Sequence, residues 1–153
     1  TTGQATPLTR KGYRGPSTPA GSVEEPFNPL ALMLEAGATF VARGFAGNTD
    51  QLADLMAQAI EHEGCAFVDI LQPCVTFNNT WQTYRSLTTT LEAPAATLGE
   101  ALAVARRTDK LPLGVVYRQE KPVYHRELQG NRNLVADHPT RAARLEALEK
   151  LLA

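Results

Sequence analysis

A short apolar run that ends in a polar loop limits the possible fold of this 153-residue chain more than any other feature. Residues 65–71 are mostly aliphatic or aromatic, and the run is too short for a typical globular helix. Such a run is typical of a strand buried on both faces in the middle of a parallel sheet. Gln72 and Pro73 should end it, because proline has no N–H to donate to a neighbouring strand. Cys74 then follows the carboxyl end of the strand, where open α/β sheets bind their ligands.

The sequence before this strand predicts a βαβ unit. Residues 38–42 form another short apolar run, and residues 50–63 carry apolar side chains at helical spacing after Thr49, a capping residue. A strand, a helix and the strand at 65–71 in this order predict two parallel strands joined by a right-handed crossover.

Other elements are predicted on both sides of this unit. Asn28 before Pro29 predicts the start of a short helix that ends at Gly37. Downstream we expect a short helix or turn at 79–86, a helix from the Thr97–Glu100 capping box to about 107, a strand at 113–117, an irregular polar stretch at 120–133 and a helix from Pro139. Three parallel strands with helices between them would form half of a doubly wound, mainly parallel α/β sheet. A sheet this small leaves an open edge, which we expect sequence outside this chain or a partner to cover.

The expected organisation is an irregular loop at 1–28, a βαβ core at 29–107, and a last strand, loop and C-terminal helix at 108–153. Residues 1–28 are rich in proline and glycine and have no apolar period, so they form either a flexible linker or a ligand loop. The backbone amides and hydroxyls of residues 2–7, Thr-Gly-Gln-Ala-Thr-Pro, could face an anion or simply form a capped turn.

Composition excludes several classes of partner and compartment. A net charge of −1 gives no reason to expect nucleic acid or an anionic membrane as partner, and no apolar run is long enough to span a bilayer. Cys65 and Cys74 lie at opposite ends of one strand and cannot form a disulfide within it, which favours a reducing, cytoplasmic compartment. The chain does not begin with Met, so we expect a processed or partial polypeptide.

Three roles remain open for Cys74 from the residues alone. It could be a small packed hydrophobe, the commonest fate of a free cysteine, while Cys65 should face the core. It could be a nucleophile, but His62, His125 and His138 lie in polar stretches without a shared motif, and we expect His62 to be solvated at its helix end. It could be a metal ligand, but a cluster normally needs four cysteines.

Several segments resemble one enzyme family. Residues 64–78, Gly-Cys-Ala-Phe-Val-Asp-Ile-Leu-Gln-Pro-Cys-Val-Thr-Phe-Asn, resemble the beta subunit of 2-oxoacid:ferredoxin oxidoreductases, which act on pyruvate, 2-oxoglutarate and related acids. Residues 3–8 are similar to that family's Gly-Gln-x-Ser-Pro-Thr segment, except that Leu8 replaces the last hydroxyl residue. Residues 37–43 and the tail from 113 also fit, so the whole chain resembles the C-terminal half of the subunit.

The resemblance implies a sheet of the thiamine-diphosphate-binding type and a set of cofactors. In that family the beta subunit binds thiamine diphosphate and Mg²⁺, and the metal ligands lie just upstream of the segment that begins at Thr2. Thr2, Gly3 and Gln4 would therefore lie near the diphosphate. Cys74 matches the fourth cysteine ligand of a [4Fe–4S] cluster in many members, whose other three ligands lie upstream. The resemblance assigns no catalytic acid or base to this chain, and the chain alone is expected to lack the cluster and activity.

The implied activity is thiamine-dependent oxidative decarboxylation of a 2-oxoacid to acyl-CoA, with electrons passed through iron–sulfur to ferredoxin. The implied partners are an alpha subunit in a heterodimer, ferredoxin, the 2-oxoacid and coenzyme A. The choice of 2-oxoacid would depend largely on the alpha subunit. The alternative is a non-catalytic assembly or interaction domain derived from the same family.

Overall fold

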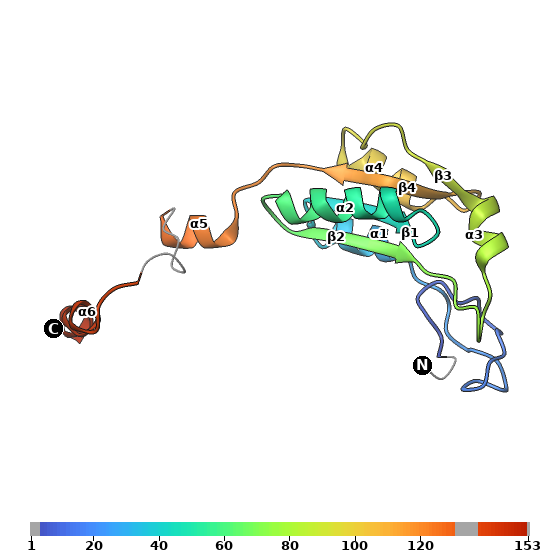
Figure 1. The fold of residues 1–153 in the computed structure, drawn as a ribbon, viewed down its shortest axis with the longest axis horizontal. Coiled ribbons are helices and arrows are strands. Elements are labelled where there is room, and N and C mark those ends of the chain that lie inside the picture. Colours follow the sequence, from blue (N-terminus) through green and yellow to red (C-terminus); the bar gives the residue numbers. More distant parts are fainter. Residues whose placement is uncertain (1–3, 131–137, 153) are drawn as a thin grey trace. The chain divides into compact units, whose positions relative to one another are not determined.

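The computed structural model describes residues 4–130 and 138–152, and the chain divides into two compact units, Thr1–Lys121 and Pro122–Ala153. The first unit contains four helices and four strands among its described residues (Figure 1). In chain order they are α1 (Pro29–Glu35), β1 (Phe40–Phe45), α2 (Thr49–Glu61), β2 (Ala66–Leu71), α3 (Trp81–Leu87), β3 (Thr88–Thr90), α4 (Leu98–Ala105) and β4 (Leu111–Arg118).

The four strands form one mainly parallel sheet in the order β2-β1-β4-β3. β1 pairs with β2 in parallel, as predicted, and β3 pairs with β4 in parallel. β4 runs antiparallel to β1, with an irregularity between Val41 and Ala42. The α/β class is thus confirmed, but the prediction that all three expected strands are parallel was wrong for β4. An apolar run indicates a strand but carries no information about its direction.

Helices cover both faces of this sheet, which gives three layers (Figure 1). On one face, Leu55 of α2 packs against Phe40 and Ala42 of β1. On the other face, α1 and α4 pack together against β1 and β4. The buried members of this second cluster are Leu30, Ala31, Leu34, Ala38, Val41, Ala101, Ala105, Val116 and Tyr117.

The helix starts follow local capping chemistry. The Asn28 side chain caps α1, and Thr97 and Glu100 form the predicted capping box of α4. Asn48, rather than the predicted Thr49, caps α2. Both residue types are good caps and they are adjacent, so the sequence alone could not choose between them.

β2 is the outermost strand of the described sheet, so the prediction of a central strand buried on both faces was wrong. Ala66 and Ile70 are exposed and Leu71 is buried. Cys65, just before the strand, is exposed and does not face the core, contrary to expectation. Apolar composition shows that a strand is suited to burial, not that an element covers it.

An ion pair fixes β2 to β1 at the register Arg43–Asp69. The Nε–Oδ2 distance is 2.7 Å, and the Arg43 side chain is 2% exposed. Breaking one member of such a buried pair leaves an uncompensated charge, so the pair fixes the register of the two strands.

The second unit contains α5 (Tyr124–Gln129) and α6 (Arg141–Leu152). α6 confirms the predicted C-terminal helix, but no residue of it is buried. α5 corrects the expectation of an irregular stretch at 120–133 as far as this stretch is described. It was missed because its residues are mostly polar and exposed, and it ends at Gly130 with φ +61°. Within the described residues, no helix is long and apolar enough to cross a lipid bilayer.

Candidate functional site

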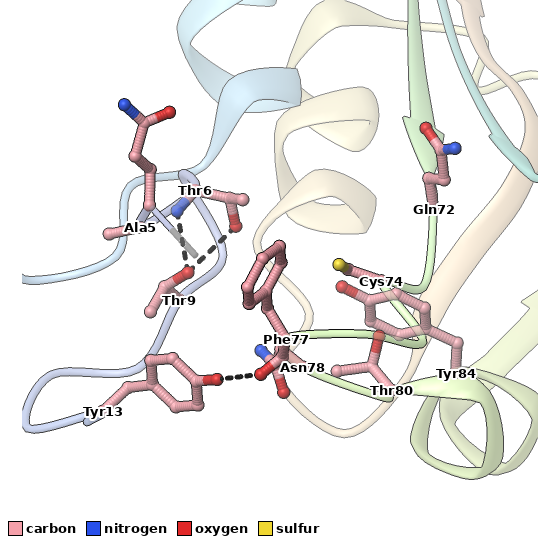
Figure 2. Close-up of a pocket in the computed structure, with 11 residues that line it drawn as sticks. Ala5, Thr6, Thr9, Tyr13, Gln72, Cys74, Phe77, Asn78, Thr80 and Tyr84 are labelled. Carbon is pink, nitrogen blue, oxygen red and sulfur yellow. Dashed lines mark hydrogen bonds between the residues drawn. The ribbon is translucent and has the colours of Figure 1, made fainter. Parts of the chain in front are cut away.

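A cavity of about 280 Å³ lies between the N-terminal segment and the loop after β2 (Figure 2). Residues 4–28 contain no helix or strand, as predicted, and they reach this loop at the carboxyl end of β2. The cavity is lined by Gln4, Ala5, Thr6, Thr9, Tyr13, Gln72, Cys74, Phe77, Asn78, Thr80 and Tyr84. The structure thus brings Gln4 and Cys74 to one cavity, whereas Thr2 and Gly3 lie outside the described residues.

Cys74 begins a tight turn whose backbone surrounds its sulfur. The Asn78 N–H donates a hydrogen bond to the Cys74 carbonyl oxygen, with an N–O distance of 2.9 Å. The backbone N–H groups of Phe77, Thr76 and Asn78, with Phe77 first, lower the pKa of Cys74 below its ordinary value of 9.0, because they favour the negatively charged thiolate. Cys74 is also exposed, so a packed hydrophobe does not describe it.

Aromatic packing connects Tyr84, which lines the cavity, to the sheet. The rings of Trp81 and Tyr84 on α3 meet the ring of Phe45 edge-on, with centroid distances of 5.3 and 6.2 Å. Phe45 belongs to a buried cluster with Leu71 of β2 and Leu113 of β4. The end of the cysteine loop, residues 72–80 between β2 and α3, is thereby anchored to the sheet through α3.

One hydrogen bond joins the two segments across the cavity. The Tyr13 hydroxyl donates to the carbonyl oxygen of Phe77 at an O–O distance of 2.6 Å (Figure 2). Within the N-terminal segment, the Thr6 N–H donates to Thr9 Oγ1 at 2.8 Å. Sequence reasoning missed Tyr13, because its partner is 64 residues away and no local pattern signals the contact.

His62 lies before β2, at the opposite end of that strand from the Cys74 loop, and is buried with an exposed fraction of 8%. Its Nε2 is 2.8 Å from Thr39 Oγ1, which also accepts a hydrogen bond from the Cys65 N–H at 3.0 Å. Burial and the positive charge of Arg118 lower the pKa of His62, partly opposed by Glu120. The expectation of a solvated histidine was therefore wrong, because the chain after α2 folds back over Thr39.

Among residues 4–130 and 138–152, no group of three His, Cys, Asp or Glu side chains could hold a metal ion. Cys74 offers one exposed sulfur with three backbone donors around it. This donor chemistry suits one thiolate ligand of a cluster whose other ligands come from elsewhere.

The sequence of this chain is similar to proteins of one enzyme family. The family model for the C-terminal part of the pyruvate ferredoxin oxidoreductase beta subunit matches residues 74–133. A 2-oxoacid:ferredoxin oxidoreductase subunit beta from Sulfolobus sp is 32% identical over 168 residues, covering 99% of this chain and 55% of that protein. This chain is a relative of the 2-oxoacid:ferredoxin oxidoreductase beta subunits. The resemblance seen in residues 64–78 is therefore confirmed.

Further relatives agree in sequence and in fold. The beta subunit of 2-oxoacid:ferredoxin oxidoreductase 2 from Aeropyrum pernix is 34% identical over 133 residues, covering 76% of this chain and 43% of that protein. The solved 2-oxoglutarate:ferredoxin oxidoreductase of Magnetococcus marinus matches with a TM-score of 0.79 and 36% identity, over 95% of this chain and 52% of that one. That structure has 2-oxoglutarate, coenzyme A and succinyl-CoA bound. This chain spans about half the length of the Sulfolobus and Magnetococcus relatives.

Proposed function

We propose that this chain forms the C-terminal half of the beta subunit of a 2-oxoacid:ferredoxin oxidoreductase. The complete enzyme would decarboxylate a 2-oxoacid oxidatively to its acyl-CoA and pass the electrons through iron–sulfur to ferredoxin. The observation that carries this proposal is that the exposed Cys74 and Gln4 line the same cavity. The relatives' names support the reaction class.

Cys74 is proposed as one thiolate ligand of a [4Fe–4S] cluster. Hydrogen bonds from backbone N–H groups stabilise negative charge on a ligating sulfur, and they are among the factors that set a cluster's potential. The turn would therefore both hold the ligand and adjust its electronic properties. The other three ligands would come from outside this chain.

Thr2, Gly3 and Gln4 are proposed to lie near the diphosphate of thiamine diphosphate. The exposed Gln4 on the cavity fits this role, since a side-chain amide can donate to a phosphate oxygen. No carboxylate lines this cavity among the described residues, so the Mg²⁺ ligands would also come from outside the chain. When bound, thiamine diphosphate supplies the electron sink for decarboxylation and the cluster accepts the electrons.

The proposed setting is a cytoplasmic heterodimer with an alpha subunit, which would exchange electrons with ferredoxin and use coenzyme A. The substrate class is the 2-oxoacids, with pyruvate and 2-oxoglutarate as the first candidates to assay. By itself this chain is expected to be inactive, because it lacks the other cluster ligands.

The test is Cys74→Ser in the complete enzyme. We expect this variant to lose iron, its visible iron–sulfur absorbance and most of its ferredoxin reduction. Cys65→Ser is the matched control, because Cys65 is the other exposed cysteine and lies at the opposite end of β2. Full iron content and turnover in Cys74→Ser would refute the ligand role and favour the alternative of an assembly domain.

A further inference from the structure

One peptide unit of the loop that carries Cys74 hydrogen-bonds both to the N-terminal segment and to the Cys74 carbonyl oxygen. The Tyr13 hydroxyl donates to the Phe77 carbonyl, and the N–H of the same peptide unit, on Asn78, donates to the Cys74 carbonyl. Hydrogen bonds arranged in series through one peptide group polarise and strengthen each other. The Tyr13 hydroxyl is therefore the first link of a chain that ends at Cys74.

Tyr13 is itself firmly placed. Its N–H donates to the Arg10 carbonyl at 3.1 Å, and its carbonyl accepts from the Ser22 N–H at 2.9 Å. Ser22 is 4% exposed and donates its hydroxyl to the same Arg10 carbonyl at 2.9 Å. These bonds fix the backbone of Tyr13, and the bond to the Phe77 carbonyl oxygen fixes its hydroxyl.

We propose that Tyr13 is a positioning residue that holds the 74–78 turn against the N-terminal segment and so fixes the position of the backbone around Cys74. Figure 2 shows the Tyr13 hydroxyl reaching the Phe77 carbonyl from the N-terminal segment, with Cys74 on the same loop. The redox consequence of this role rests on the proposed function, whereas the structural tether does not.

The consequence for a bound cluster has a definite sign. N–H bonds to a ligating sulfur offset its negative charge, which favours the more negative, reduced state of the cluster. If the turn loosens, these bonds weaken and the reduction potential becomes more negative. Electron transfer from substrate would then slow, although the cluster ligand itself is intact.

The test compares Tyr13→Phe with Tyr117→Phe in the complete enzyme. Each change removes one tyrosine hydroxyl and its hydrogen bond, since Tyr117 Oη donates to Gln119 Oε1 at 3.1 Å at the opposite end of the sheet. For Tyr13→Phe we expect unchanged iron content, a more negative cluster reduction potential, and amide hydrogen exchange in residues 74–78 faster by about threefold to tenfold. For Tyr117→Phe we expect neither the potential shift nor faster exchange in that turn.

Each outcome decides a different part of the proposal. An unchanged potential in iron-loaded Tyr13→Phe overturns the redox role, and unchanged exchange in residues 74–78 overturns the tether. Loss of iron in Cys74→Ser together with an unchanged Tyr13→Phe potential leaves the proposed function standing and removes only this inference. If the wild-type enzyme carries no iron, the proposed function and the redox role both fail, and hydrogen exchange alone judges the tether.

Discussion

The two ends of β2 are built in opposite ways, although an exposed cysteine lies beside each of them. Before the strand, a buried histidine, the Thr39 hydroxyl and Gly64 form a tight, closed corner. After the strand, the chain opens into a cavity, and backbone donors gather on the sulfur of Cys74. The comparison shows that two exposed thiols beside one strand can have different backbone surroundings, and the surroundings of a thiol influence its reactivity.

The closed corner should be the more sensitive of the two ends to substitution. Its polar groups satisfy one another in a water-poor environment, where an unpaired donor or acceptor costs more than it does at the surface. The open end makes its hydrogen bonds in an exposed segment, where water can replace a lost partner.

Gly64→Ala should produce the largest effect on stability, a loss of about 3 kcal/mol in the free energy of unfolding. Gly64 has φ +147°, and a Cβ there would overlap the Thr39 hydroxyl and press on the His62 ring. Gly99→Ala is the control, because a Cβ at Gly99 in α4 meets nothing within 4 Å and should be neutral or stabilising by up to about 1 kcal/mol. Denaturant unfolding measures both, and equal results would mean that the corner is not closed.

Exchanging threonine for valine at both ends sharpens the comparison. Thr39→Val leaves the Cys65 N–H and the His62 ring without their hydroxyl partner, which we expect to cost about 2 kcal/mol. Thr9→Val removes a hydroxyl that bonds the exposed Thr6 N–H, which should cost under about 1 kcal/mol. Thermal unfolding measures the loss of stability in both variants. A larger loss for Thr9→Val than for Thr39→Val would contradict the conclusion that the end of β2 near Thr39 is the closed one.

The smallest expected effect is a pH dependence of the closed corner. Because the pKa of His62 is lower in the folded protein than its ordinary 6.5, the unfolded chain binds the proton more readily. The stabilisation by neutral His62 is thus present above about pH 6.5 and is lost as the pH falls below this value. The free energy of unfolding, measured from about pH 8 down to about pH 5, should fall less steeply in His62→Gln than in wild type. A parallel pH profile would show that His62 titrates alike in both states.

Local chemistry in the sequence was enough to find much of the fold. Asn28 before Pro29, the Thr97–Glu100 box and the stop at Pro73 each act through neighbouring residues, and each was predicted correctly. The parallel β1–β2 pair followed from the order of strand, helix and strand. The place of Cys74 after the strand followed from the same order.

Features that depend on distant residues could not be predicted in this way. β4 pairs antiparallel with β1 and parallel with β3, and β3 has only three residues to signal its presence. His62 was misjudged because its burial depends on Thr39, 23 residues away. The bond from Tyr13 to Phe77 likewise leaves no mark on either local sequence.

The outer position of β2 has a practical consequence for anyone who produces this polypeptide by itself. Among the described residues the strand is paired on one side only, and Asp69, its one charged residue, is turned toward Arg43. Bare backbone donors and acceptors next to apolar side chains act as a template for another copy of the same strand. Concentrated solutions of this polypeptide by itself should therefore aggregate, whereas a protein segment that pairs with or covers β2 should keep it soluble.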